Sequence, residues 1–277
     1  MAFRRPGIYK TPEELRRLVQ PGLVTAASLD AVAELVAPGM TTAELDAEAE
    51  RTIRRLGGEP NFMLVPGYRH TVCASVNDAV VHGVPGPRVL RPGDLVSVDS
   101  GAQVDGWNGD SARTFVLDDP DRPDVVGRRR RLSDLTEQSL WRGIAALATA
   151  RHLHEVGAAI SDFLEDEGDP GIVEDYVGHG IGRSMHEEPS VPNYRVRAKG
   201  PAVRPGLVVA IEPMVTLGGI ETVTQPDGWT VTTADGSDAA HWEHSVAVHD
   251  GGIWVLTAAD GGAAGLAPLG VTPVPID

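Results

Sequence analysis

The apolar residues near the start of the chain recur at helical spacing. The segment TPEE at residues 11–14 predicts a helix start, because Thr can cap, Pro suits the first helical position, and Glu completes a capping box. Pro21-Gly22 predicts an interruption, after which the apolar spacing resumes as far as Val36. A second helix is predicted over residues 41–55, again with Glu three residues after Thr, and it ends before two consecutive glycines.

The pattern then changes to short apolar runs that are rich in Val and Gly. Residues 61–117 predict several strands, divided by turn signals such as Asp105-Gly106. The polar segment that follows, residues 118–131, predicts a loop. Helical spacing returns over residues 133–149 and 157–167, which we expect to form two further helices.

A second strand-rich stretch covers residues 171–256. The order of helix, helix and strands therefore occurs twice, which favours an α+β fold built from two similar halves. No low-complexity segment separates the halves. We expect one domain over residues 11–258, a short N-terminal arm at 1–10, and a Gly/Pro-rich tail at 259–277 that is loose or clings to the surface.

The two strand-rich stretches also share a local sequence pattern. Residues 91–99 and 204–212 align without a gap, since each begins Arg-Pro-Gly, continues as an apolar strand and ends in an acid. A His-Gly step precedes each segment, and a second acid that opens a further strand follows it. We interpret this shared order as an internal duplication. The repeated positions are His82 and His179, Asp99 and Glu212, and Asp110 and Glu243.

These acids occupy positions where an ionised carboxylate is costly. Asp99 and Glu212 each end a strand that is apolar on both faces, and a charge buried there is unfavourable unless it is paired or bound to a metal. If Asp105-Gly106 closes a two-residue hairpin, Asp99 pairs with position 112, and Asp110 is its diagonal neighbour on the same face. A bulge at Gly109 would bring the two acids closer.

Neighbouring carboxylates repel each other unless they share a proton or a cation. Four carboxylates with a histidine are more anionic ligands than one cation takes, whereas two cations bridged by carboxylates accommodate them. Oxygen-rich ligation with one imidazole suits Mn, Fe, Co or Zn in a dinuclear hydrolase. The pattern therefore predicts a site for two divalent metal ions.

The composition limits which classes of partner the protein can bind and which cellular compartment it suits. The formal net charge is −15, from 24 Lys and Arg against 39 Asp and Glu, so nucleic acid or an anionic membrane has no electrostatic attraction for the chain. The single cysteine, Cys73, excludes an intrachain disulfide and fits a reducing compartment. No apolar run reaches the ~18–20 residues of a membrane span, and residues 1–15 lack the apolar core of a signal peptide. We therefore expect a soluble, cytoplasmic protein.

Four separate motifs resemble those of one known family. GHGIGRSMHEEPSVPNY, GLVVAIEPMV, WEHSVAV and VSVDSGAQVDGWNGDSARTF are similar to the signatures of type I methionine aminopeptidases. The resemblance covers about residues 10–258 with the family's spacing. It implies the α+β "pita-bread" fold, in which two pseudo-twofold αα-β halves surround a curved antiparallel sheet, in agreement with the repeat.

The resemblance also implies roles for individual residues. Its dinuclear centre falls on Asp99, Asp110, His179, Glu212 and Glu243, with Asp110 and Glu243 bridging the two ions, Asp99 on one ion, and His179 with Glu212 on the other. A metal-bridging water or hydroxide attacks the carbonyl of the first peptide bond, and Glu212 accepts its proton. His186 steadies the oxyanion or the scissile amide, and His82 lies near the substrate amine and the leaving group.

The implied methionine pocket matches the family less closely. Tyr68, Cys73 and Trp229 stand at family positions, and we interpret Cys73 as a pocket wall because no His–acid pair belongs to it. Phe62 and Val65 replace the Cys and Tyr of many relatives, and Met185 replaces Phe, so the pocket stays apolar although its shape differs.

The resemblance further implies the reaction and the partners. The enzyme removes the initiator methionine from nascent proteins, preferably when the second residue is small. It acts as a monomer, with neither nucleic acid nor membrane as a partner. The run Arg128–Arg131 predicts a solvated face, with contact to the ribosome as the alternative interpretation. Strand alternation places His244 opposite Glu243, and we include neither His241 nor His244 among the ligands.

Three other functions compete with this interpretation. X-Pro aminopeptidases and prolidases share the five ligands but usually carry a long additional N-terminal domain, for which a catalytic region that starts near residue 10 leaves no room. A metal-free relative that serves as a binding module lacks some of the ligands present here. A creatinase-type hydrolase likewise lacks the full set of acids.

Overall fold

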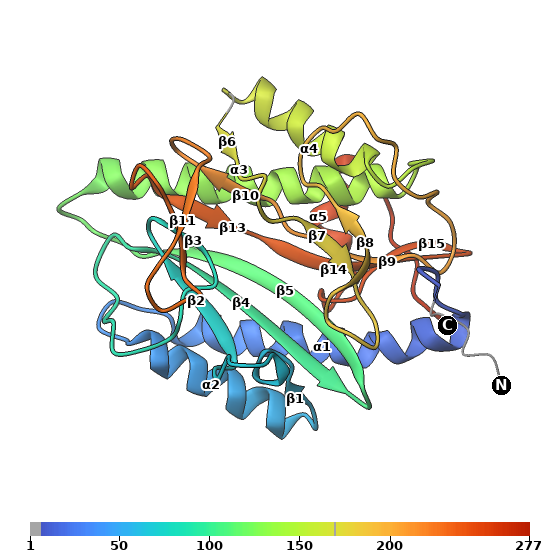
Figure 1. The fold of residues 1–277 in the computed structure, drawn as a ribbon, viewed down its shortest axis with the longest axis horizontal. Coiled ribbons are helices and arrows are strands. Elements are labelled where there is room, and N and C mark those ends of the chain that lie inside the picture. The colour runs from blue at the N-terminus through green and yellow to red at the C-terminus, as the bar shows by residue number, and fades with distance from the viewer. Residues whose placement is uncertain (1–6, 169) are drawn as a thin grey trace.

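A curved antiparallel sheet of nine strands forms the centre of the computed structural model, which describes residues 7–168 and 170–277 (Figure 1). Seven strands follow one another in the order β1-β4-β5-β14-β9-β7-β8, while β2 pairs with β4, and β15 pairs with β14. Their bounds are β1 Glu59–Pro60, β2 Val72–Val76, β4 Leu95–Val104, β5 Trp107–Val116, β7 Gly178–Gly180, β8 Glu187–Val191, β9 Val208–Ile211, β14 Glu243–His249 and β15 Gly252–Val255.

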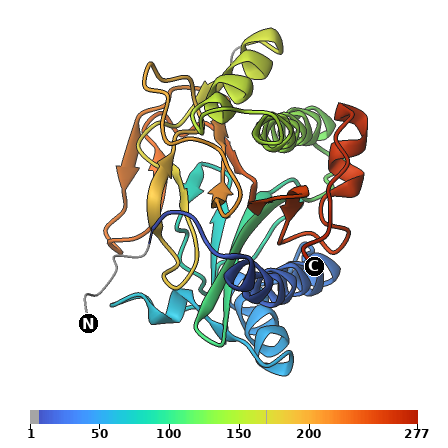
Figure 2. The same cartoon turned by 90° about the vertical axis from the view of Figure 1, so that its right-hand side faces the viewer.

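Two pairs of helices cover the same side of this sheet (Figure 2). One apolar cluster joins the first pair to strands β2 and β4, and another joins the second pair to β9, β14 and β15. Each half of the molecule therefore buries its strands under two helices of its own, which gives the α+β pita-bread fold with its pseudo-twofold arrangement. The helices are α1 Pro12–Leu35, α2 Thr42–Arg55, α3 Pro123–Leu147 and α4 Glu155–Asp166.

Two small three-stranded sheets complete the structure, and the one that contains β10 and β13 packs against α3. Their orders are β13-β10-β6 and β11-β12-β3. The strands are β3 Ala79–Val81, β6 Gly171–Ile172, β10 Met214–Thr216, β11 Thr222–Thr224, β12 Val231–Thr233 and β13 Ala239–His241, and a short 3-10 turn, η1, covers Phe62–Leu64. Since β3 comes from the first half and β11 and β12 from the second, this part of the structure joins the two halves.

The interruption predicted at Pro21-Gly22 is wrong, because α1 continues through both residues. Both are buried, and a Cβ on Gly22 would lie 2.4 Å from the Leu256 carbonyl oxygen. A Cβ on Gly109 of β5 would lie 2.7 Å from the Pro21 carbonyl oxygen. Tight packing against the sheet therefore holds the helix together where local propensity disfavours it.

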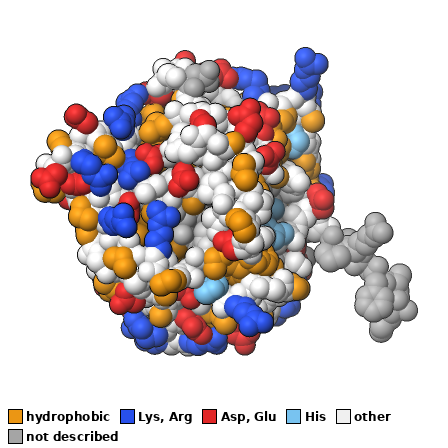
Figure 3. Space-filling view, turned by 60° about the vertical axis from the view of Figure 1, so that its left-hand side comes forward, with side chains coloured by type: hydrophobic (Ala, Val, Ile, Leu, Met, Phe, Trp, Pro, Cys, Tyr) orange, Lys and Arg blue, Asp and Glu red, His pale blue; other side chains and the backbone are white. Residues whose placement is uncertain are grey.

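The loop predicted over residues 118–131 is also wrong in its second part, because α3 begins at Pro123. Proline is compatible with the first turn of a helix, and charged side chains on the next turn form ion pairs. Arg129 lies 2.6 Å from Asp238, and Arg130 pairs with Asp118. Figure 3, with this side of the molecule forward, shows Lys and Arg side chains interspersed with Asp and Glu side chains.

Both ends of the described chain lie against the rest of the structure. In the tail, α5 covers Ala263–Leu266 and a 3-10 turn, η2, covers Ala267–Leu269; Leu266 is buried beside α3. Val274 N–H donates to the Ile253 carbonyl over 3.0 Å. Of the predicted arm, residues 1–6 lie outside the described residues. No helix among the described residues is both long and apolar enough to span a membrane.

Candidate active site

One row across the central sheet brings three of the five predicted ligands together. Asp99 of β4 pairs with Ala112 of β5, and Ala112 pairs with Glu243 of β14. His244 pairs with Ile211, so the next step of the same register sets Glu243 beside Glu212, just after β9. Directly paired residues in an antiparallel sheet share a face, so these three carboxylates point to the same side, separated only by the methyl group of Ala112.

Asp110 joins this row from two positions before Ala112 on β5. The turn between β4 and β5 has positive φ at Asp105 and Gly106, which is the two-residue hairpin that the sequence predicts. The ladder from Leu95 to Val104 runs without a register shift, so the bulge predicted at Gly109 is wrong. Gly109 instead leaves room for α1, as described above. Period-two alternation alone sets Asp110 on the face of Asp99.

Backbone contacts hold the strands that carry these acids. Ser245 Oγ donates to the Asp110 carbonyl over 2.7 Å, and Ser111 Oγ donates to the Glu243 carbonyl over 2.6 Å. The Asn193 side chain donates to the Glu212 carbonyl and accepts from the Glu212 N–H, each over 3.1 Å. The two halves are therefore joined at the place where the acids meet.

The carboxylates are buried and incompletely paired. One oxygen each of Asp99, Asp110, Glu212 and Glu243 is enclosed and lacks a hydrogen-bond partner among the described residues. Burial raises the pKa of Asp99 to about 7. Burial and the neighbouring charges, Asp99 first, also raise the pKa of Asp110 and Glu212, and burial with the charge of Asp110 raises that of Glu243. Such a cluster is unfavourable without cations, so the donor set fits divalent metal ions.

His179 completes the set from β7. Its Nδ1 lies 3.0 Å from the Gly180 carbonyl oxygen, which can only accept, so Nδ1 carries the proton. The lone pair on Nε2 then faces Glu212, 3.5 Å away, and Asp110, 3.9 Å away. Burial lowers the pKa of His179 to about 4, so the ring is neutral and able to ligate. A Cβ on Gly180 would lie 2.2 Å from the Glu188 carbonyl, which explains why glycine follows this histidine.

The ligand atoms form two overlapping groups of three. Asp99, Asp110 and Glu243 make one group, and His179, Glu212 and Glu243 make the other, with the donor atoms of each group within 4.8 Å of one another. A third group contains Asp110, His179 and His186. Glu243 is shared by the first two groups, Asp110 by the first and third, and His179 by the second and third.

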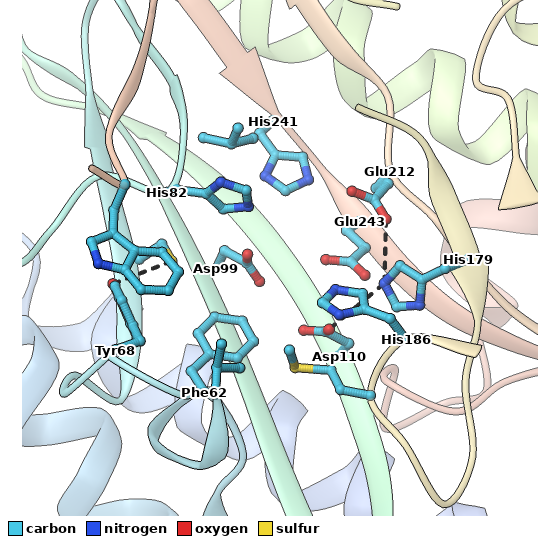
Figure 4. A pocket seen from close by; sticks show the side chains of 15 residues that line it. Phe62, Tyr68, His82, Asp99, Asp110, His179, His186, Glu212, His241 and Glu243 are labelled. Carbon is cyan, nitrogen blue, oxygen red and sulfur yellow. Dashed lines mark hydrogen bonds and ion pairs between the residues drawn. The ribbon is translucent and has the colours of Figure 1, made fainter. Parts of the chain in front are cut away.

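His82 and His186 lie beside the carboxylates, from opposite halves of the chain (Figure 4). His82 follows β3 with φ of 58° and packs edge-on against Tyr176, with ring centroids 5.4 Å apart. His186 lies in the loop between β7 and β8, and its ring centroid is 4.3 Å from that of His179. Burial lowers the pKa of both rings, so both are neutral near pH 7.

The pocket that contains the carboxylates and histidines continues into an apolar end. Tyr68 lies at its centre, with ring centroids 6.5 Å from Phe62 and 5.0 Å from Trp229. The Tyr68 hydroxyl donates to the Val72 carbonyl over 2.8 Å and lies 3.3 Å from Cys73 Sγ. Burial raises the pKa of the Cys73 thiol, which keeps it neutral and unreactive. Every predicted site residue lines this one pocket: Phe62, Val65, Tyr68, Cys73, His82, Asp99, Asp110, His179, Met185, His186, Glu212, Trp229 and Glu243.

The sequence interpretation missed one pocket residue of polar character, His241. It lies at the end of β13, lines the pocket, and has a buried Nε2 with no hydrogen-bond partner among the described residues. Burial, and next the nearby His82, lower its pKa to about 3. Its position two residues before Glu243 was the available signal, because alternation sends both side chains to one face. His244 lies on the opposite face as predicted, with Nδ1 2.8 Å from Thr257 Oγ1.

A curved antiparallel sheet that presents clustered carboxylates and a histidine, with two helices behind each half, defines a pita-bread metallohydrolase. Comparison with known proteins agrees with this class: residues 17–250 match the model of metallopeptidase family M24. The chain belongs to this family and, within it, to the methionine aminopeptidases.

Two curated relatives illustrate the relationship. The chain is 46% identical over 263 residues to methionine aminopeptidase 1 of Mycobacterium tuberculosis, covering 92% of this chain and 96% of that protein. It is 40% identical over 250 residues to methionine aminopeptidase 1 of Bacillus subtilis, covering 90% of this chain and 98% of that protein.

Solved structures give the same result. The crystal structure of methionine aminopeptidase from Rickettsia prowazekii matches with a TM-score of 0.84 at 31% identity, covering 90% of this chain and 99% of that one. The prolidase from Pyrococcus furiosus shares the fold, with a TM-score of 0.68 at 22% identity, over 91% of this chain and 65% of that chain.

Proposed function

We propose that this enzyme removes the N-terminal methionine from nascent proteins by metal-dependent hydrolysis of the first peptide bond. The observation that carries the proposal is the continuity of two features in one pocket. Clustered carboxylates with His179 form one end, and an apolar wall around Tyr68 forms the other. An exopeptidase needs both, because the scissile carbonyl and the side chain of the first residue must be bound together.

Two divalent ions fit the site best. Asp110 and Glu243 would bridge them, Asp99 would hold one, and His179 with Glu212 would hold the other. The two overlapping donor groups and the unpartnered carboxylate oxygens support this arrangement. Co, Mn, Fe and Zn all suit such ligands. When bound, the ions supply Lewis acidity and lower the pKa of coordinated water.

The chain's own side chains then handle protons and position the substrate. Glu212 is the proposed proton acceptor, because it faces the cluster with one buried oxygen that has no hydrogen-bond partner among the described residues. Neutral His186 would donate a hydrogen bond to the carbonyl oxygen as negative charge develops there. Neutral His82, on the opposite side of the pocket, would lie near the substrate amine and the leaving group.

The apolar end of the pocket is the proposed methionine site. Phe62, Val65, Met185 and Trp229 offer an unbranched thioether a wall of aromatic and flexible apolar groups, which suits sulfur–aromatic contact. Neutral Cys73 and Tyr68 close this wall. The same proposal includes a preference for a small second residue and action in the cytoplasm as a monomer. For the run Arg128–Arg131 it keeps a solvated face, with contact to the ribosome as the alternative.

The test is the release of free methionine from the peptide Met-Ala-Ser by metal-free protein reconstituted with Mn, Fe or Co, with a chelator control. We expect metal-dependent cleavage of Met-Ala-Ser, slower cleavage of Met-Leu-Ser, and none of Gly-Pro or Ala-Pro-Ala. Cleavage of only the proline peptides would replace the proposal with an X-Pro peptidase. No cleavage despite bound metal would contradict an enzymatic role on these substrates.

A further inference from the structure

The segment 182–187, which runs from the loop after β7 to the first residue of β8, carries Met185 and His186 into the pocket, so the position of this loop segment decides where both side chains lie. One end of the loop is held by β5. The backbone N–H and the side-chain Nδ2 of Asn108 both donate to the Gly182 carbonyl, each over 2.9 Å.

The other end of the loop is held by a residue from outside the sheet. Lys10 Nζ donates to Glu187 Oε2 over 2.5 Å, while Glu187 Oε1 accepts from the Ser184 N–H over 2.9 Å. The Lys10 side chain is only 7% exposed and that of Glu187 18%, so this ion pair is largely shielded from water. Lys10 also packs across Gly182, where a Cβ would lie 2.7 Å from Lys10 Cε.

Lys10 itself is fixed by its backbone. Its N–H donates to the Gly206 carbonyl over 2.6 Å, and the preceding residue, Tyr9, bridges to Leu207 just before β9. The Arg204 guanidinium lies 3.8 Å above the Tyr9 ring. Lys10 therefore joins the start of α1, the approach to the strand that leads to Glu212, and the loop of His186. Neither Lys10 nor Glu187 lines the pocket.

We propose that Lys10 is a positioning residue for hydrolysis, which acts through Glu187 to hold His186 and Met185 in the pocket. The proposal rests on the proposed function of His186. Removing the ammonium group would leave the shielded Glu187 carboxylate with Ser184 N–H as its only remaining hydrogen-bond donor among the described residues, and an uncompensated charge of this kind favours displacement toward water. Displacement of Glu187 would move the loop, and with it the His186 ring.

The experiment compares Lys10→Met with wild type, with Lys199→Met as the matched control. Lys199 is the other lysine of the chain and is exposed, so the control removes the same charge without touching the loop. We expect Lys10→Met to lower kcat for Met-Ala-Ser about tenfold, the range seen when a supporting partner of an active-site group is lost. Metal content should stay unchanged, and backbone hydrogen exchange over residues 182–187 should become faster.

The double variant Lys10→Met/Glu187→Gln separates positioning from general destabilisation. It removes both charges, so no unpaired carboxylate remains, and we expect slower loop exchange and higher kcat than in Lys10→Met alone. Wild-type kcat and exchange in Lys10→Met would overturn the proposal, as would equal losses in Lys199→Met. If wild type released no methionine, the proposed function would fail, yet loop exchange in the same variants would still decide whether Lys10 holds the loop.

Discussion

The two halves of the sheet supply matching donors but unequal pocket walls. In the first half, Asp99 and Asp110 lie on β4 and β5, which a two-residue turn connects directly. In the second half, residues 213–242 separate Glu212 from Glu243 and form the strands β10 to β13. Trp229 and His241 both lie in this inserted segment, residues 213–242, and line the pocket.

This difference between the halves assigns catalysis and substrate selection to different parts of the structure. The repeated strands meet in the middle of the sheet, where they bring acids from both halves onto one face. The inserted segment 213–242, which has no counterpart in the first half, packs against β3 of that half and closes the pocket from one side. A duplicated sheet therefore accounts for a cation-binding cluster, and the asymmetric segment accounts for a pocket that distinguishes one end of a peptide.

The largest expected effect concerns the carboxylate cluster that the two repeated halves form together. Asp110→Ala and Glu243→Ala remove one carboxylate from each half, and we expect both to abolish methionine release, because each is proposed to bridge the two ions. Activity on Met-Ala-Ser and metal content are the measurements. Asp118→Ala, which removes an exposed carboxylate from the connection after β5, should keep wild-type activity. Normal turnover in either bridging variant would sink the dinuclear assignment.

A smaller effect is expected for a residue beside the cluster. His186→Ala should lower kcat about 10²-fold, because it removes one hydrogen-bond donor to the developing charge and leaves the ligands in place. Metal analysis of the purified variant should give the wild-type ratio. Loss of metal together with activity would instead make His186 a ligand, in line with its place in the third donor group.

The role of the inserted segment 213–242 in substrate binding is tested by the KM of variants at Trp229. Trp229→Leu removes an aromatic face that packs against Tyr68, and we expect KM for Met-Ala-Ser to rise about tenfold with kcat nearly unchanged. Trp229→Phe, which keeps an aromatic ring, should fall between this variant and wild type. A fall in kcat at constant KM would mean that the inserted segment 213–242 takes part in catalysis. That result would contradict its assignment to substrate selection alone.

The smallest effect concerns stability without metal. Burial raises the pKa of Asp99 to about 7, above its ordinary 3.8, so the folded metal-free protein binds more protons than the unfolded chain between those values. Stability therefore falls as pH rises through this window. We expect the Tm of metal-free protein to be lower at about pH 8 than at about pH 5, by about 2–4 °C for each kcal/mol lost. Asp99→Asn should reduce this difference, and an unchanged difference would contradict the assignment.

The arrangement of the acids could be predicted because it depends on local rules. The Asp105-Gly106 hairpin and strand alternation are sufficient to set Asp99 and Asp110 on one face, and the structure confirms both. The repeat in the sequence relates these acids to Glu212 and Glu243 without any knowledge of strand pairing. The burial of acids in apolar strands indicates cations.

The errors arose where packing between distant segments decides the structure. The helix continues through Pro21 because Gly22 meets Leu256 and Gly109 admits the helix against β5. In the second turn of α3, Arg129 donates a hydrogen bond to Asp238, a residue over a hundred positions away. His241 is the exception, because its position two residues before Glu243 is a local signal. The helix contacts have no signature in the neighbouring sequence.

The most direct test of the account is the metal stoichiometry of the wild-type protein, measured by titrating metal-free enzyme with Mn²⁺. The account predicts about two ions per chain, with one site lost in Asp99→Asn and the other in Glu212→Gln. That result would show that each half of the sheet completes one site of a shared centre. Binding of a single ion to wild type at saturation, with both variants losing the same ion, would contradict it.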